Sequence, residues 1–228
     1  MATAAKVSQS PRGLSITRCA RQILDELKRA PPAHTAAWRA KRRRWSRELA
    51  DEPPRAVIAL AVTLVKHGLW ARLTAYELIA QHRDAIAALD AASVRRLANG
   101  LADWPSVDTF GCLVAGPAWR DGHVGMREID AWVGSSDRWQ RRLALVCTVA
   151  LNVRARGGHG DPARTLRVCR QLVADRDDMV VKALSWALRT LVFWDPRGVR
   201  SFLREHAATL APRVRREVTR KLQTGRKN

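Results

Sequence analysis

The sequence has few cysteines, and none is placed as a disulfide framework or a zinc site would require. Cys19, Cys112, Cys147 and Cys169 are widely separated, form no CxxC pair and have no histidine at metal-ligand spacing. They lie in apolar stretches such as LALVCTVAL, which is typical of buried structural cysteines. We therefore expect no disulfide framework, no bound metal and no cofactor.

Long apolar runs are also absent. No run approaches the roughly 18 residues that a membrane-spanning helix needs. The first residues, MATAAKVSQSPRG, lack the hydrophobic core of a signal peptide. These two absences predict a soluble protein that does not use a membrane and works inside the cell, in the bacterial cytoplasm or nucleoid.

Acidic residues are scarce as well. Lys and Arg number 41 against 21 Asp and Glu, for a formal net charge of +20 among 228 residues. Such an excess costs self-repulsion unless a polyanion neutralises it, so it predicts a nucleic-acid partner. The densest basic stretches are WRAKRRRWSR and the C-terminal RVRREVTRKLQTGRKN, each of which could also be a solvated helix face. No helix-turn-helix, zinc-finger or RNA-recognition signature is present, so we expect contacts to the backbone of a duplex rather than to base edges.

Almost every segment has helical periodicity, and no run alternates with a period of two. ITRCARQILDELKRA carries one apolar stripe, and PPRAVIALAVTLVKHG is apolar nearly all round, as an inner helix should be. Turn-forming stretches such as DEPPR, GGHGDP and WDPRG separate these segments. The pattern predicts an all-α chain of about a dozen short helices.

Two segments suggest an internal repeat. WQRRLALV, from Trp139, aligns with MVVKALSW, from Met179, at an offset of 40 residues, which is in the range of HEAT-like helical pairs. Chance similarity of two amphipathic helices is the alternative. The repeat predicts a curved α-solenoid with a basic concave face, in one monomeric domain over residues 14–222. A flexible tail over residues 1–13 and a basic tail over residues 223–228 would flank it.

Phenylalanine and tyrosine are scarce, with three Phe and one Tyr against nine Trp. Trp104, Trp139 and Trp186 stand in segments that also carry charged residues suited to a cation or a DNA backbone. In LADWPSVDTF, Trp104 precedes Asp108 by one helical turn if Pro105 takes the first turn of a helix. We expect the remaining tryptophans to pack in the interior: Trp38, Trp45, Trp70, Trp119, Trp132 and Trp194.

Three stretches in this order carry a resemblance: DWPSVD, DRWQRRLALV and MVVKALSWALRT. The chain resembles the AlkD-type DNA alkylation repair enzymes, which are HEAT-like-repeat DNA glycosylases, over roughly residues 56–220. The resemblance implies that Asp108 is the catalytic carboxylate and that Trp104 and Trp186 flank the sugar of the lesion. It also implies that Arg142 contacts the DNA backbone, and we expect neighbouring basic residues to do the same: Lys182, Arg189 and Arg141.

The implied reaction fits these residue types. A purine alkylated at N3 or N7 is already cationic, so it leaves without a general acid while the sugar develops oxocarbenium character. A nearby carboxylate and electron-rich indoles stabilise that cation. The resemblance further implies base-excision repair of alkylated double-stranded DNA without base flipping, so that bulky adducts could be accepted.

Alternatives remain open from the residues alone. Asp108 could be a helix-start carboxylate, or an ion-pair partner of Arg95 or Arg96. The chain could also be a non-catalytic HEAT-like module that binds nucleic acid, or a scaffold whose tryptophans anchor an acidic protein.

Overall fold

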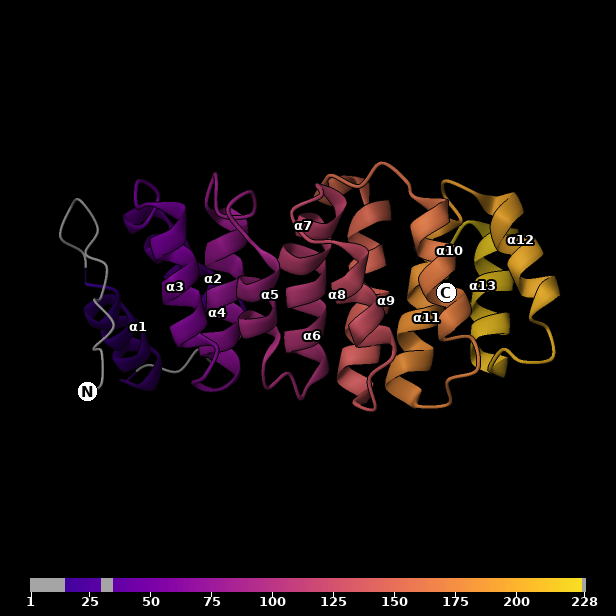
Figure 1. Ribbon diagram of the computed structural model, residues 1–228, viewed down its shortest axis with the longest axis horizontal. Coiled ribbons are helices and arrows are strands. Elements are labelled where there is room, and N and C mark those ends of the chain that lie inside the picture. The colour runs from indigo at the N-terminus through magenta and orange to yellow at the C-terminus, as the bar shows by residue number, and fades with distance from the viewer. Residues whose placement is uncertain (1–14, 30–34, 227–228) are drawn as a thin grey trace. The chain divides into compact units, whose positions relative to one another are not determined.

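The computed structural model describes residues 15–29 and 35–226, and these residues form helices and no strands (Figure 1). The all-α prediction is therefore confirmed for this part of the chain. Within the same residues, no helix has the length and apolar character needed to cross a membrane. The predicted tail of residues 1–13 lies outside the described residues.

By its internal contacts the chain divides into two compact units, Met1–Ala88 and Leu89–Asn228. The single domain expected over residues 14–222 stays a prediction.

The first unit contains four helices: α1 (Ile16–Arg29), α2 (Thr35–Glu48), α3 (Pro54–Leu64) and α4 (Gly68–Gln81). Helix α3 packs against both α1 and α4, which explains why its sequence is apolar on most sides. Helix α2 packs against α4, and the buried Trp38 donates a hydrogen bond from Nε1 to Thr74 Oγ1 at 2.9 Å.

The basic stretch of residues 38–47 lies in α2, and part of its charge is neutralised within the first unit. Arg42 pairs with Glu77 at 2.8 Å, and Arg44 pairs with Glu26. Trp45, in the same stretch, is buried. Among the six tryptophans expected to pack, four are buried and two are partly buried: Trp38, Trp45, Trp119 and Trp132, then Trp70 and Trp194.

The second unit holds the candidate site. Its helices are α5 (Ala91–Ala98), α6 (Trp104–Phe110), the π-helix η1 (Gly111–Ala115), α7 (Gly116–Arg120), α8 (Met126–Val133), α9 (Arg138–Asn152), the 3-10 helix η2 (Arg154–Arg156), α10 (Pro162–Gln171), α11 (Asp178–Leu191), α12 (Pro196–Glu205) and α13 (Pro212–Thr224). Helix α9 is its centre and contacts α6, η1, α7, α8, α10 and α11, while α11 packs in turn against α13 (Figure 1).

The 40-residue offset seen in the sequence corresponds to matching helix starts. Helices α9 and α11 begin 40 residues apart, and each is capped by the aspartate that precedes it. Asp137 accepts a hydrogen bond from Trp139 N, and Asp177 accepts one from Met179 N, both at 2.9 Å. Arg142 and Lys182 therefore occupy equivalent positions, each four residues after the start of its helix.

The last helix runs slightly further than the sequence predicts. Helix α13 ends at Thr224, two residues into the segment 223–228 that was expected to be a basic tail. Gly225 ends the helix at a φ of 68°, in the left-handed region that favours glycine. Residues 227 and 228 lie outside the described residues.

Helices α6, η1 and α7 form one helical stretch that packs closely on α9. At Gly116 an added Cβ would lie 2.6 Å from Ala150 Cβ and 2.5 Å from Gly111 O, so only glycine fits there. The Gly116 N–H donates to Gly111 O, five residues back, and Pro117 beside it has no N–H to give. This close approach holds α6 against α9, which positions the site.

Candidate functional site

The start of α6 positions Trp104 and Asp108 one helical turn apart. Asp103 caps the helix by accepting hydrogen bonds from Ser106 N at 2.8 Å and Ser106 Oγ at 3.0 Å. Pro105 lies in the first turn, where a missing N–H costs nothing, as the sequence predicts. Trp104 is 56% exposed, whereas the Asp108 side chain is only 19% exposed. An accessible indole therefore stands one turn before a largely buried carboxylate.

Asp108 forms a two-point ion pair with Arg142 of α9. Arg142 Nε donates to Asp108 Oδ1 at 2.9 Å, and Nη2 donates to Oδ2 at 2.8 Å. The third contact of the guanidinium is from Nη1 to Met179 O, at the start of α11, at 2.5 Å. One arginine thus joins α6, α9 and α11 and fixes both oxygens of the carboxylate.

Both structural alternatives for Asp108 are wrong. The carboxylate that caps the start of α6 is Asp103, while Asp108 lies one turn further along. Arg95 pairs instead with Glu128 at 2.8 Å, and Arg96 donates to Ser93 Oγ at 3.5 Å. Both arginines lie on α5. The partner of Arg95 lies on α8, and the partner of Arg96 lies in the first turn of α5 itself.

The electrostatics of Asp108 combine burial with nearby positive charge. Burial raises the pKa of the Asp108 carboxyl, because the charged form loses water. The hydrogen bonds and charge of Arg142, and the charge of Arg156, lower that pKa and offset part of the effect. A carboxylate held in such a partly desolvated position acts more strongly on a nearby cation than one in water.

Arg142 is almost enclosed in this arrangement. Its side chain is 7% exposed, and three of its nitrogens donate to Asp108 and to the Met179 carbonyl. The geometry suits a residue that orients the carboxylate. Contact between Arg142 and a DNA backbone stays a prediction.

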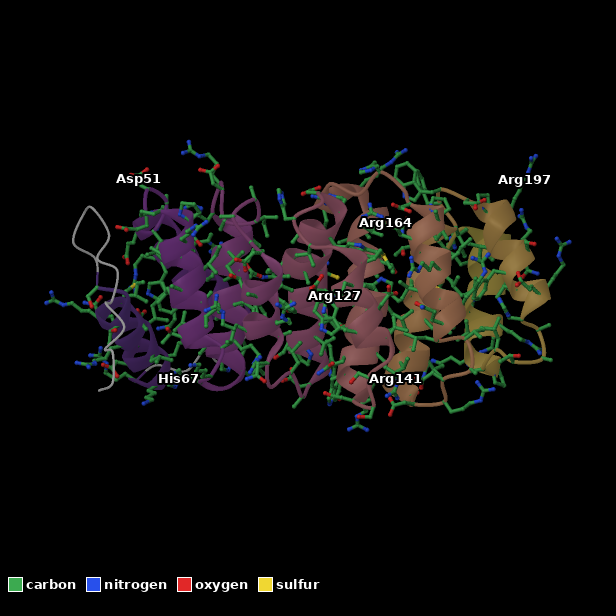
Figure 2. The ribbon with its side chains drawn as sticks, viewed as in Figure 1. Asp51, His67, Arg127, Arg141, Arg164 and Arg197 are labelled. Atoms are coloured by element: carbon green, nitrogen blue, oxygen red, sulfur yellow. The ribbon has the colours of Figure 1, made fainter. Side chains whose placement is uncertain are left out.

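The other predicted DNA-binding residues also have protein partners. Arg141 Nε donates to Asp175 Oδ2 at 2.6 Å, and its Nη1 donates to Ser135 O and Ser136 O, at the lower end of α9 in Figure 2. Arg189, with a side chain 12% exposed, contacts Ser185 and lies 3.8 Å from Glu217. These two residues tie neighbouring elements together.

Lys182 is the most accessible of the four predicted DNA contacts. Its side chain is 39% exposed, and its Nζ lies 2.5 Å from Asp178 Oδ2, one turn earlier on α11. Trp186 stands one turn later on the same helix and is partly buried. Of α11, the Met179 carbonyl contacts Arg142, which holds Asp108 of α6; Lys182 and Trp186 lie on the same helix, and their part in the site stays a prediction.

Arg156 is the site residue that the sequence reading missed. It belongs to RARGGHG, in the loop after α9, where the glycines by themselves indicate only a turn. Its backbone carbonyl accepts a hydrogen bond from Arg120 Nη1 at 2.6 Å, and its charge acts on Asp108. A basic loop that follows a helix of the site is the signal that could have revealed it.

The site contains the oriented carboxylate of Asp108, the exposed indole of Trp104 and the positive charges of Arg142 and Arg156. Within the described residues, no group of three or more His, Cys, Asp or Glu side chains could hold a metal ion. Three of the cysteines are buried, and burial raises the pKa of the Cys112 thiol, which lies one turn beyond Asp108, to about 12. The arrangement suits electrostatic stabilisation of a cation by Asp108 better than thiol chemistry.

Comparison with known proteins identifies the family. No curated protein and no solved structure matches the chain significantly. The model of one protein family, described as DNA alkylation repair enzyme, matches residues 32–222. The matched range contains α6, α9 and α11, which carry Asp108, Arg142 and Trp186. The chain thus belongs to the DNA alkylation repair enzyme family.

Proposed function

We propose that the protein is a DNA glycosylase that removes cationic N3- and N7-alkylated purines from double-stranded DNA. It would act as a hydrolase in base-excision repair, as the AlkD-type enzymes that it resembles do. The observation that carries the proposal is the Asp108 carboxylate, held at both oxygens by Arg142 and standing one turn from the exposed indole of Trp104.

The chemistry follows from the charge of the lesion. An alkylated purine that is already cationic leaves with the electron pair of the glycosidic bond, and positive charge then develops on the sugar. Asp108 would stabilise that charge, and it would orient the water whose oxygen bonds to the sugar carbon while the water loses one proton, through the carboxylate to solvent. Trp104 and Trp186 would add cation-π stabilisation around the same centre. Neutral lesions lack this leaving group and should be removed poorly.

The positive charge of the protein favours double-stranded DNA as its binding partner. The family is one of DNA alkylation repair, and the net charge of +20 favours a polyanion. We infer that the helical pairs form a HEAT-like α-solenoid whose inner helices include α9 and α11, and that a monomer binds the duplex through Lys182 and neighbouring basic residues. Such a surface could accept the base while it is still stacked, and so could tolerate bulky adducts.

Release of the free base tests the proposal. We expect the protein to release 7-methylguanine from a methylated duplex faster than buffer alone does, and Asp108→Asn to slow that release. A protein that binds the duplex but releases no base would be a non-catalytic nucleic-acid module. Absence of both binding and release would favour a protein scaffold instead.

A further inference from the structure

An aromatic and cationic cluster lies where α9 and α11 end, outside the candidate site described above. The guanidinium of Arg154 stands over two rings, 4.4 Å from the centroid of Phe193 and 4.8 Å from that of Trp194. The two rings meet edge to face, with centroids 5.2 Å apart. Phe193 is 60% exposed, which makes it one of the few large apolar side chains at the surface of the described residues.

Arg154 stacks on aromatic rings and has no carboxylate partner among the described residues. No carboxylate of the described residues lies within 4.0 Å of it, whereas Arg142 and Arg167 each pair with an aspartate. Stacking on aromatic faces restrains a guanidinium but leaves its charge and its N–H donors available. An exposed arginine held in this way is suited to bind an anion from solution.

The cluster is anchored to the buried interior of the second unit. Trp194 Nε1 donates to Asn152 O at 2.7 Å, at the end of α9. The Asn152 side chain, itself buried, donates to Thr165 Oγ1 at 2.9 Å and accepts from Asp161 N at 3.1 Å. The Trp194 ring beneath Arg154 is therefore anchored, and an arginine stacked on it loses less freedom when it binds a ligand.

The cluster continues the face of α11 that carries the predicted site residues. Lys182, Trp186, Arg189 and Phe193 follow one another at spacings of four, three and four residues, which is one stripe of a helix. Helix α11 ends at Leu191 and residues 192–194 form a turn, in which Val192 N still donates to Leu188 O at 3.1 Å, so Phe193 lies just beyond the end of this stripe. The loop that carries Arg154 also carries Arg156, whose charge acts on Asp108.

The distance from the site can be worked out along α9. Arg142 and Asn152 are separated by ten residues of helix, or about 15 Å of rise. One DNA strand places a phosphate about every 3.4 Å along the duplex axis, so a strand that ran parallel to α9 would pass roughly four to five nucleotides over this span. A phosphate contact at Arg154 would thus lie outside the lesion itself but within one turn of the duplex.

We propose that Arg154, positioned by Phe193 and Trp194, binds a backbone phosphate of duplex DNA several nucleotides from the damaged base. The inference rests on the proposed function, because it takes the duplex as the ligand of this face. Phe193 and Trp194 are positioning residues, and Arg154 makes the contact.

The test measures the affinity for an undamaged, fluorescently labelled duplex over a range of salt concentrations. Loss of one phosphate contact should lower the slope of log K against log salt by about 0.9, which corresponds to roughly eightfold weaker binding at 0.1 M salt. We expect this for Arg154→Gln. Phe193→Ala should weaken binding in the same direction, and Phe193→Tyr, which keeps a ring under the guanidinium, should restore it.

The matched control is Arg167→Gln. Arg167 is half exposed on α10 and pairs with Asp130, so its replacement removes the same charge away from the cluster. The inference is overturned if Arg154→Gln and Arg167→Gln bind DNA equally well with equal slopes. It is also overturned if Phe193→Ala lowers only the melting temperature and leaves the affinity unchanged.

The two proposals fail separately. Release of alkylpurine by the wild type, together with an affinity that ignores Arg154, would refute only this inference. Duplex binding that depends on Arg154 without any release of alkylpurine would refute only the glycosylase assignment.

Discussion

Replacing Asp108 with asparagine should separate catalysis from binding. The substitution keeps the size of the side chain and one oxygen that can accept from Arg142, but it removes the negative charge. Loss of one preorganised electrostatic group typically costs on the order of 10²- to 10³-fold in rate. Binding of an undamaged duplex should hold or tighten slightly, because the carboxylate repels phosphates in the ground state and helps only at the transition state.

The same substitution should also lower stability by a limited amount. Asp108 accepts two charge-assisted hydrogen bonds from Arg142, and asparagine can keep one of them as a neutral acceptor. The cost should be about 1.5 to 3 kcal/mol, the usual value of a hydrogen bond to a charged group. For a chain of this size each kcal/mol lowers the melting temperature by about 2 to 4 °C. The assay temperature must therefore lie well below the melting temperature of the variant.

The assay is single-turnover release of 7-methylguanine with enzyme in excess and at saturation, corrected for release in buffer alone. Asp175→Asn is the matched control, because Asp175 pairs with the neighbouring Arg141 at 2.6 Å and its side chain is only 10% exposed. It should lose stability but keep the wild-type rate. The reasoning is refuted if Asp108→Asn releases the base as fast as the wild type, or if Asp175→Asn is equally slow.

Three further predictions concern the indoles, the pH profile and the salt dependence. Trp104→Ala and Trp186→Ala should each slow saturated release by only about 2- to 30-fold, since one cation-π contact supplies roughly 0.5 to 2 kcal/mol; a defect as large as that of Asp108→Asn would contradict this ranking. In the proposed mechanism Asp108 acts in its ionised form, so the rate of release should fall as the pH drops through a pKa that burial raises. Arg142→Gln removes the charge that lowers this pKa, so the acid limb of the pH–rate profile should move to higher pH, and an unmoved limb would show that Arg142 does not act on Asp108. Duplex affinity should fall with salt at a log-log slope of several units, and Lys182→Gln should reduce that slope by about one; an affinity that ignores salt would point to another partner.

Local chemistry determines the helices that bear the site. Asp103 and Pro105 define the start of α6 through a cap and a fixed φ, and these act within one turn of chain. The spacing of four residues then puts Trp104 and Asp108 on one side of that helix. The starts of α9 and α11 are also set locally, by the capping residues Asp137 and Asp177, so the 40-residue offset in the sequence already predicts that these starts match. The sequence alone also supported the family, because its three motifs were recognisable without any fold.

The partners of Arg141 and Arg142 were decided only by tertiary packing. Arg141 and Arg142 are neighbours in sequence, yet a helix turns about 100° between them, so one pairs with Asp175 and the other with Asp108. The sequence suggested Arg95 or Arg96 as the ion-pair partner of Asp108, whereas the partner is Arg142, 34 residues away. The close packing of α7 on α9 at Gly116 brings Arg142 to Asp108. Periodicity says which face a residue occupies, and only the packing of helices distant in sequence decides which charge it meets.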